Sequence, residues 1–221
     1  MEARTTGLIL RTRPLTETSL IVHWLTADAG RIATVARGAR RPKSVFRGKL
    51  DLCFVADLTF VRARRSDLHA LKEVSLRETH AALRRDVERL QQAAYAVSLI
   101  EQTTERDTPL PEVYELTAGF LGELARHDWR AESVLWFELK LLAELGLRPD
   151  VATARVSPRT RRLVEEIFPA SWAEAFQLQP DAGQVKELAH FLHGFLLHHL
   201  ERLPKGRSAA LRHEVGVGGA A

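Results

Sequence analysis

The spacing of hydrophobic residues divides the chain into a β-rich first third and a helical remainder. Short runs of alternating and β-branched residues continue to about residue 76, and turn residues such as Asp28-Ala29-Gly30 separate them. The pattern predicts five strands, at Gly7–Arg13, Ser19–Leu25, Arg31–Ala36, Leu52–Val61 and Leu68–Leu76. Because no helical pattern lies between these runs, we expect a small antiparallel barrel or sandwich.

After residue 80 the apolar residues recur at helical spacing. The pattern predicts helices over Leu83–Ile100, Val113–Leu124 and Glu132–Gly146, with Gly146 as the C-cap of the third. Ser157-Pro158 is typical of a helix start, and Asp181 with Gln184 resembles a capping box that opens a last helix through about Leu200. We therefore expect a β domain over residues 1–78, an α-helical domain over residues 79–213 and a disordered tail at 214–221.

One segment of the β-rich part is strongly cationic. The basic segment, Val35–Leu50, holds six cations and no carboxylate: Arg37, Arg40, Arg41, Lys43, Arg47 and Lys49. Gly38, Pro42 and Gly48 interrupt it, so it cannot form one long helix. A flexible cationic loop between strands is typical of a site that grips a polyanion, with the charges on phosphates and the sheet offering apolar or stacking surface to bases. The alternative is a solvated loop without a partner, but cations this dense repel one another unless an anion binds them.

Composition supports a nucleic-acid-binding N-terminal part. The 221 residues carry a net charge of +4, which is unevenly placed: residues 1–75 have a net charge of +7 and the remainder a net charge of −3. Cys53 is the single cysteine and lies in an apolar run, so we expect a buried thiol, no disulfide and a cytoplasmic protein. We find no signal peptide and no run of 18 apolar residues, so we expect no membrane association.

Other candidate chemistry is weak. His190 and His193 share a helix face with Glu187 one turn earlier, and His198 and His199 follow, but the spacing lacks a recognised zinc motif, and exposed helix histidines are the simpler interpretation. No phosphate loop, nucleophile elbow or dinucleotide fingerprint is present, which favours a binding protein without catalytic, metal-binding or cofactor residues. A second cationic stretch, Arg202–Arg212, either binds DNA or carries ordinary cations after a helix.

Four stretches resemble a known family. They are Gly7-Leu8-Ile9-Leu10-Arg11-Thr12-Arg13 with Glu17-Thr18-Ser19-Leu20; Gly30-Arg31 with Val35-Ala36-Arg37-Gly38-Ala39-Arg40-Arg41, Lys43-Ser44 and Arg47-Gly48; Phe137–Gly146; and Leu203-Pro204-Lys205-Gly206-Arg207-Ser208. Together they are similar to the RecO family of bacterial recombination mediators, over about residues 4–210. The segment around Gly38-Ala39-Arg40-Arg41 is the most specific of them.

The resemblance implies an α+β architecture: a five-stranded OB-fold barrel followed by an α-helical domain. It implies binding of single- and double-stranded DNA, annealing of complementary strands, capture of the acidic tail of single-stranded-DNA-binding protein, and loading of RecA together with RecR, all at the nucleoid. The sequence leaves open whether RecF takes part. Many relatives carry a four-cysteine zinc module after the central helix, whereas this chain has no cysteine there, so we expect no zinc.

These arguments give the following candidate residues. For DNA binding they are Arg11, Arg13, Arg37, Arg40, Arg41, Lys43, Arg47, Lys49, Lys205 and Arg207, and for the partner tail they are Arg126 and Lys140. Two other classes stay open: an OB-fold RNA-binding module, which would prefer structured RNA, and a metal-dependent nuclease, which would cleave DNA with magnesium.

Overall fold

The computed structural model describes residues 1–212, and the predicted tail at 214–221 lies outside them. In this range the strands are β1 (Glu2–Pro14), β2 (Leu20–Thr26), β3 (Gly30–Ala36), β4 (Val55–Val61) and β5 (Leu68–Glu78). A 3₁₀-helix (Ala81–Arg85) and seven α-helices follow: α1 (Val87–Thr103), α2 (Pro111–Arg126), α3 (Ala131–Glu144), α4 (Pro158–Ile167), α5 (Trp172–Ala175), α6 (Ala182–Leu200) and α7 (Arg207–Ala210).

The chain forms two compact units. The first unit contains residues 1–81 and 97–121, and the second contains residues 82–96 and the chain from Gly122 onward. Helices α1 and α2 therefore each contribute one part to each unit. The predicted boundary near residue 78 stays a prediction, because a sequence pattern follows elements and not the unit to which each part of a helix belongs.

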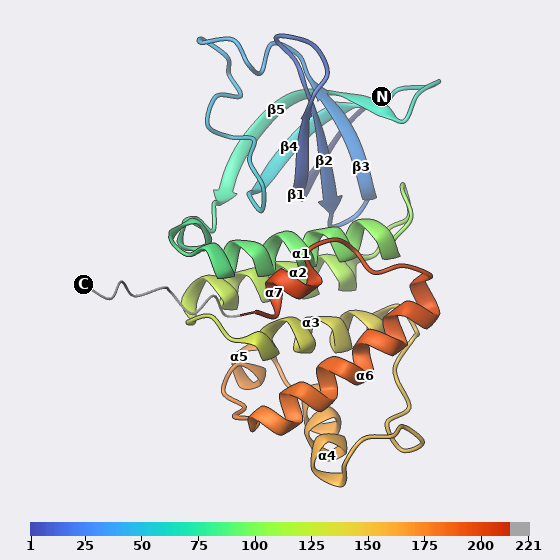
Figure 1. Cartoon of the computed structure of the whole chain (residues 1–221). Helices are drawn as coiled ribbons and strands as arrows, with labels where there is room; N and C mark the ends of the chain where they lie inside the picture. The colour runs from blue at the N-terminus through green and yellow to red at the C-terminus, as the bar shows by residue number, and fades with distance from the viewer. Residues whose placement is uncertain (213–221) are drawn as a thin grey trace, which may run out of the picture. The chain divides into compact units, whose positions relative to one another are not determined.

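The five strands close into a barrel, drawn in blue to cyan in Figure 1, with the strand order β1-β2-β3-β5-β4. Antiparallel pairing joins all neighbours except β3 and β5, which pair in parallel through Ala33–Leu68 and Val35–Ala70. This order, with one parallel pair that closes the sheet, is the OB-fold topology. The expected fold class, an OB-fold barrel followed by an α-helical region, is confirmed.

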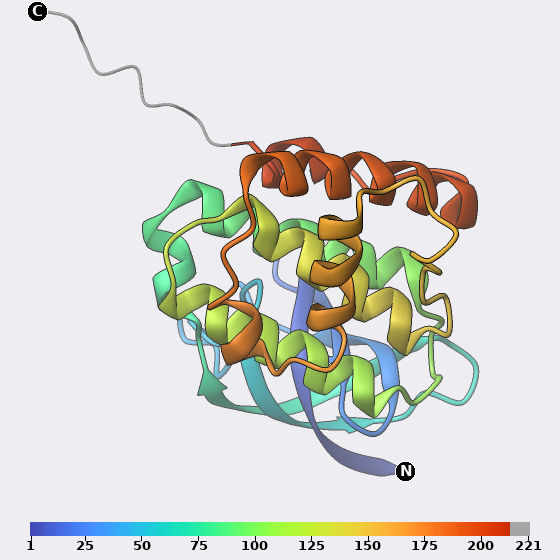
Figure 2. The ribbon, with the colours of Figure 1, turned by 90° about the horizontal axis from the view of Figure 1, so that it is seen from below.

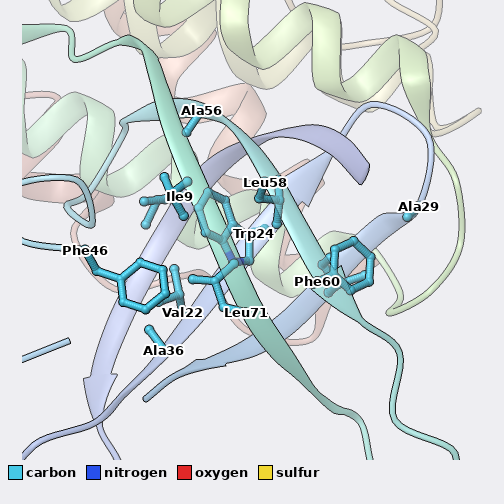
Figure 3. Packing of buried hydrophobic residues seen from close by; sticks show 12 residues of the cluster. Ile9, Val22, Trp24, Ala29, Ala36, Phe46, Ala56, Leu58, Phe60 and Leu71 are labelled. Atoms are coloured by element: carbon cyan, nitrogen blue, oxygen red, sulfur yellow. The ribbon is translucent and has the colours of Figure 1, made fainter. Parts of the chain in front are cut away.

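The barrel interior is filled by one cluster of apolar side chains (Figure 3). Ile9, Val22, Trp24 and Leu58 are at most 1% exposed, and the indole N–H of Trp24 donates to the hydroxyl of Thr34 at 2.9 Å. This bond satisfies a polar group that would be costly to bury alone. The tryptophan can therefore lie at the centre of the barrel.

The strands differ from the predicted ones at their ends. β1 is 13 residues long and has a bulge at Leu10, so that Ile9 pairs with Trp24 but Arg11 pairs with His23. The predicted strand at Leu52–Val61 begins only at Val55, because a turn precedes it in which the N–H of Phe54 donates to the carbonyl of Asp51. Pairing ends depend on partner strands, which the local pattern does not contain.

In the second unit the most buried helix is α3, in which every residue from Ser133 to Leu142 is buried. Helices α4 and α6 pack against α3 and against each other (Figure 2). The helix ends follow the predicted signals. Asp181 and Gln184 form the capping box of α6, Ser157 accepts from the N–H of Thr160 at the start of α4, and Gly146 follows α3 with φ +73°. Each such cap contributes about 1 kcal/mol.

A carboxylate of α6 holds the start of α4. Glu187 accepts hydrogen bonds from the N–H of Ser157 at 2.7 Å, from its hydroxyl at 2.8 Å and from the hydroxyl of Thr160. These bonds keep the pKa of Glu187 below its usual range, chiefly through Thr160 and then through Ser157. The chain therefore ties α4 to α6 with a carboxylate.

Glycine is required at Gly30, in the turn between β2 and β3. Its φ is +68°, and a Cβ atom there would lie 2.1 Å from the carbonyl oxygen of Thr108. Gly48, in the basic segment, has a similar φ of +71° but no heavy atom within 4 Å of the same position. Replacing Gly48 by a larger residue therefore introduces backbone strain alone, whereas replacing Gly30 introduces both backbone strain and steric overlap.

We expect Gly48→Ala to lower the free energy of unfolding by about 1–2 kcal/mol, because only the left-handed backbone is strained. Gly30→Ala should cost a further 1–3 kcal/mol or so, because the methyl group overlaps Thr108. Urea unfolding of both variants measures the difference. Equal losses would contradict the close approach of the two backbones.

Candidate nucleic-acid interface

The basic segment is anchored in the barrel by Phe46. This side chain is 6% exposed and belongs to the same core cluster as Trp24 and Leu71, as Figure 3 shows. Full burial of a phenylalanine contributes roughly 1.5–3 kcal/mol. The segment, predicted to be a flexible loop, is thus attached to the barrel core through Phe46, and Ala39 and Leu50 of the same segment pack against the cluster as partly buried side chains.

Successive turns give the basic segment its shape. The N–H groups of Arg41, Ser44, Arg47 and Lys49 each donate to the carbonyl three residues earlier, at 3.0–3.2 Å. In addition, the N–H of Arg40 donates to the carbonyl of Thr18, in the β1–β2 turn, at 3.0 Å. These bonds satisfy many of the backbone polar groups of the segment, and the side chain of Arg47 donates to the carbonyl of Pro42 at 3.3 Å.

Most cations of the basic segment are exposed to solvent. Lys49 is half-buried and donates to the carbonyl of Val74 at 3.0 Å, and the other five are exposed. Within residues 1–212, none of the six has a carboxylate oxygen within 4.0 Å. Six neighbouring charges without counter-charges produce a strongly positive local potential.

An open groove of about 520 Å³ runs beside the basic segment. Arg37 and Arg41 line one side of it, Thr16 and Thr18 of the β1–β2 turn lie on another, and His69 of β5 completes it. The ring of His69 stacks on Phe60 at 5.4 Å between centroids, and burial lowers the pKa of His69. The groove therefore offers two guanidinium groups and several hydroxyl groups.

The β4–β5 turn adds cations that the sequence analysis did not single out. Arg62, Arg64 and Arg65 are all exposed, and the turn leads directly into the groove wall at Leu68–Ala70. The guanidinium group of Arg62 lies 5.7 Å from the centre of the Phe60 ring. The sequence contains a signal for this cationic turn, since three cations fall within four residues between two predicted strands, separately from the larger group of cations at 37–49.

A second and larger groove, of about 1010 Å³, crosses β1, β4 and β5. It is lined by three cations and three carboxylates: Arg4, Lys49, Lys72, Asp28, Asp57 and Glu73. Asp57 is itself paired with Arg77 at 2.8 Å. Because these charges balance, this surface is less suited to a polyanion than the basic segment.

Aromatic side chains within residues 1–212 are buried or half-buried. No Phe, Trp or Tyr within residues 1–212 is exposed, and Trp24, Phe46 and Phe60 lie inside the barrel. Phe54, Phe191 and Phe195 are half-buried, so the stacking surface expected from the sequence stays a prediction. The exposed groups of the basic segment and its groove are mainly cations and hydroxyl groups, which recognise the backbone.

Arg11 and Arg13 lie in different surroundings. Arg13 is exposed, whereas the guanidinium group of Arg11 lies 2.8 Å from the carboxylate of Glu101. His23 lies opposite Arg11 in the neighbouring strand, and its pKa is lowered to about 4 by burial and then by the charges of Arg11 and other arginines. Arg13 is thus free for an anion, while Arg11 already has a partner.

Lys205 and Arg207 also lie in different surroundings. Lys205 is exposed, but Arg207 is 6% exposed and forms a bidentate pair with Glu138 of α3, at 2.6 and 2.8 Å. The hydroxyl of Tyr95 donates to the same carboxylate at 2.6 Å, and burial, followed by the charge of Glu138, raises the pKa of Tyr95. We therefore leave Arg207 out of the proposed interface.

The two candidates for the partner tail are engaged within the second unit. Lys140 is 8% exposed and donates to the carbonyls of Phe168 and Ala170, beyond the end of α4, and burial lowers its pKa. Arg126 is exposed and lies 2.6 Å from the carboxylate of Glu123. Arg126 remains accessible to an acidic peptide, and Lys140 does not.

The late histidines do not form a metal site in the described part of the chain. His190 and His193 are exposed on α6, and Glu187 is occupied by Ser157 and Thr160. Within residues 1–212 no group of three or more His, Cys, Asp or Glu side chains is arranged to hold a metal ion. Over the same residues, no helix is both long and apolar enough to cross a bilayer.

Barrel and helices together define a two-part protein, an OB-fold with a positive segment joined to a helical bundle. Comparison with known families places it more closely. Residues 1–80 match the family model "Recombination protein O N terminal", and residues 84–154 match "Recombination protein O C terminal". The chain belongs to the RecO family.

Individual relatives agree with the family models. The chain is 34% identical to a DNA repair protein RecO of Rhodopirellula baltica over 69% of its length, and 30% identical to one of Alkaliphilus metalliredigens over the same share. A DNA repair protein RecO of Prosthecochloris aestuarii is 26% identical over 79% of the chain. The aligned part spans 57%, 62% and 64% of these three relatives, about three fifths of their length.

The different surroundings of Lys205 and Arg207 give a paired prediction. Arg207→Ala leaves Glu138 buried without its cation, so we expect the free energy of unfolding to fall by about 3–5 kcal/mol. Lys205→Ala should change it by less than about 0.5 kcal/mol, because the side chain is exposed. Thermal melting measures both. If the Arg207 variant is as stable as the Lys205 variant, the result contradicts a buried ion pair between Arg207 and Glu138.

Proposed function

We propose that this chain is a DNA repair and homologous recombination mediator that acts on DNA as a binder and not as a catalyst. The observation that carries the proposal is the set of six cations without carboxylate partners, held on an anchored segment of an OB-fold barrel. The names of the relatives, DNA repair protein RecO, support the same function. In this proposal the protein works at the nucleoid, in the cytoplasm.

The first step is binding of single- and double-stranded DNA through phosphates. Arg37, Arg40, Arg41, Lys43 and Arg47, with Arg13 and the arginines of the β4–β5 turn, would contact the backbone. Because these contacts are to phosphates and not to base edges, binding should depend little on sequence. Each neutralised phosphate releases counterions, so affinity should fall steeply with salt.

The second step is annealing of complementary strands. Two strands repel each other through their phosphates, and cations that bind both of them lower this repulsion and raise the rate of encounter. No proton transfer or covalent intermediate is needed. The unpaired charges of the basic segment are suited to this task because no internal ion pair has to break first.

The third step is capture of the acidic tail of single-stranded-DNA-binding protein, which would bring the chain to coated DNA. An apolar groove with a bordering cation would suit such a tail, and Arg126 is the accessible candidate. With RecR, the chain would then promote loading of RecA. These partners come from the family resemblance, and the residues that bind them are not assigned.

Removal of two cations from the basic segment should weaken DNA binding measurably. With four to six phosphates neutralised, the log–log salt slope on single strands should be about −3 to −4, and Arg40→Ala with Arg41→Ala should reduce its magnitude by about 1.4. At 0.1 M salt this corresponds to an affinity loss of roughly 25-fold. Fluorescence anisotropy with an oligonucleotide, at several salt concentrations, measures both quantities.

The matched control removes two cations from the balanced groove, as Arg4→Ala with Lys72→Ala. It changes the net charge equally, but both side chains lie in a groove that also holds three carboxylates. We expect its salt slope to stay close to that of the wild type. If the two double variants behave alike, net charge and not the basic segment governs binding.

Annealing of two complementary oligonucleotides, each precoated with single-stranded-DNA-binding protein, tests the mediator function. We expect fast annealing with the intact coat protein and slow annealing when its acidic tail is deleted. Annealing of naked strands alone would leave a DNA-binding protein without the mediator function. No annealing, together with a preference for structured RNA, would favour an RNA-binding module.

A further inference from the structure

Helix α4 and the turn before it carry a second group of exposed cations. Within residues 155–162 there are four arginines and no carboxylate, and Arg155, Arg159 and Arg162 are exposed. The opposite face of α4 is buried through Thr160, Leu163, Val164 and Ile167. The arginines therefore form a solvent-facing surface on the second unit.

The charge order along α4 is the reverse of the order that stabilises a helix. Arg159 and Arg161 lie in the first turn, where the helix dipole is positive, and Glu165 and Glu166 lie in the last turn, where it is negative. Helix stability does not explain this order. The N-terminal end is instead supported by Ser157 and Glu187, so the cations are available for another purpose.

Most of this charge is unpaired. Arg159 lies 3.0 Å from the carboxylate of Asp181. Arg155 and Arg162 have no carboxylate oxygen of residues 1–212 within 4.0 Å. This is the same condition that marks the basic segment of the barrel, although the cations here are fewer.

We propose that the surface formed by Arg155, Arg159 and Arg162 holds a second DNA strand, so that one chain carries two strands at once. This rests on the proposed function. The basic segment belongs to the first unit and the α4 surface to the second. Each surface binds the phosphate backbone of one strand, and a single chain can thereby present both strands for annealing.

The chemistry around α4 favours a nucleic-acid backbone over an acidic peptide. The large apolar side chains of α4, Leu163, Val164 and Ile167, are buried on its other face. A peptide with an apolar end needs apolar walls, which these buried side chains do not supply on the arginine face. Exposed guanidinium groups suit phosphate oxygens well, because their geometry allows two parallel hydrogen bonds.

Native mass spectrometry with excess dT12, which cannot pair with itself, counts the strands on each chain. We expect two oligonucleotides on one wild-type chain and one on the variant Arg155→Gln with Arg162→Gln. Arg159 is left unchanged because it pairs with Asp181. At low salt and high oligonucleotide concentration, any residual second binding event of the variant should have a salt slope smaller in magnitude by about 1.4, as expected for two lost phosphate contacts.

Two further variants serve as controls. Glu165→Gln with Glu166→Gln alters the same helix with the opposite change of charge, and we expect it to keep two strands. If the arginine-to-glutamine variant proves unstable in thermal melting, Arg155→Lys with Arg162→Lys keeps the charge and is expected to restore two strands.

The outcomes separate this proposal from the proposed function. A wild-type chain that binds only one dT12, or an arginine-to-glutamine variant that stays folded and still binds two, overturns the two-strand arrangement and leaves DNA binding intact. A wild-type chain that binds none overturns both. An α4 surface that takes up a polyglutamate peptide but not dT12 also overturns the proposal made here.

Discussion

Burial of Phe46 in the barrel is the constraint on which the interface depends. Six like charges within thirteen residues favour an extended and mobile chain, and Phe46 in the core, with Ala39 and Leu50 packed against the same cluster, opposes that tendency. The core of the OB-fold and the charge of its surface are therefore coupled through apolar residues of the same segment. A change inside the barrel would move the cations without removing any of them.

Arginine side chains lie in three kinds of surroundings in this chain, and these differ in how deeply the guanidinium group is buried. On the basic segment and at Arg155 and Arg162 it is exposed without a carboxylate partner, at Arg11 it is half-buried beside Glu101, and at Arg207 it is enclosed with Glu138 and Tyr95. Only the first group can bind an external anion without breaking an ion pair. A buried pair instead fixes how the end of the described chain packs on α3, because either partner alone would be costly to bury.

The sequence predicted the secondary-structure elements better than the contacts that individual side chains make. Strand periodicity and capping signals are local, so the five strands, Ser157, Gly146 and the Asp181–Gln184 capping box were confirmed. Lys140 and Arg207 looked like accessible cations because their partners, the carbonyls after α4 and Glu138, are far away in sequence. The bulge at Leu10 and the burial of Phe46 likewise depend on pairing and packing that no local pattern encodes. The charge of the candidate site could be predicted from the sequence, but the anchoring of the basic segment by Phe46 could not.

The bond between Glu187 and the start of α4 has a consequence for the conditions under which the helical unit holds together. A carboxylate tether needs neither a supply of zinc nor reduced thiols, and the chain has no cysteine beyond Cys53. The carboxylate tether is sensitive to low pH. Because the pKa of Glu187 is lowered by its hydrogen bonds, the tether is fully formed above about pH 4.3 and is lost only as the pH falls through the lowered value. Chelators and oxidants should leave this part of the protein untouched.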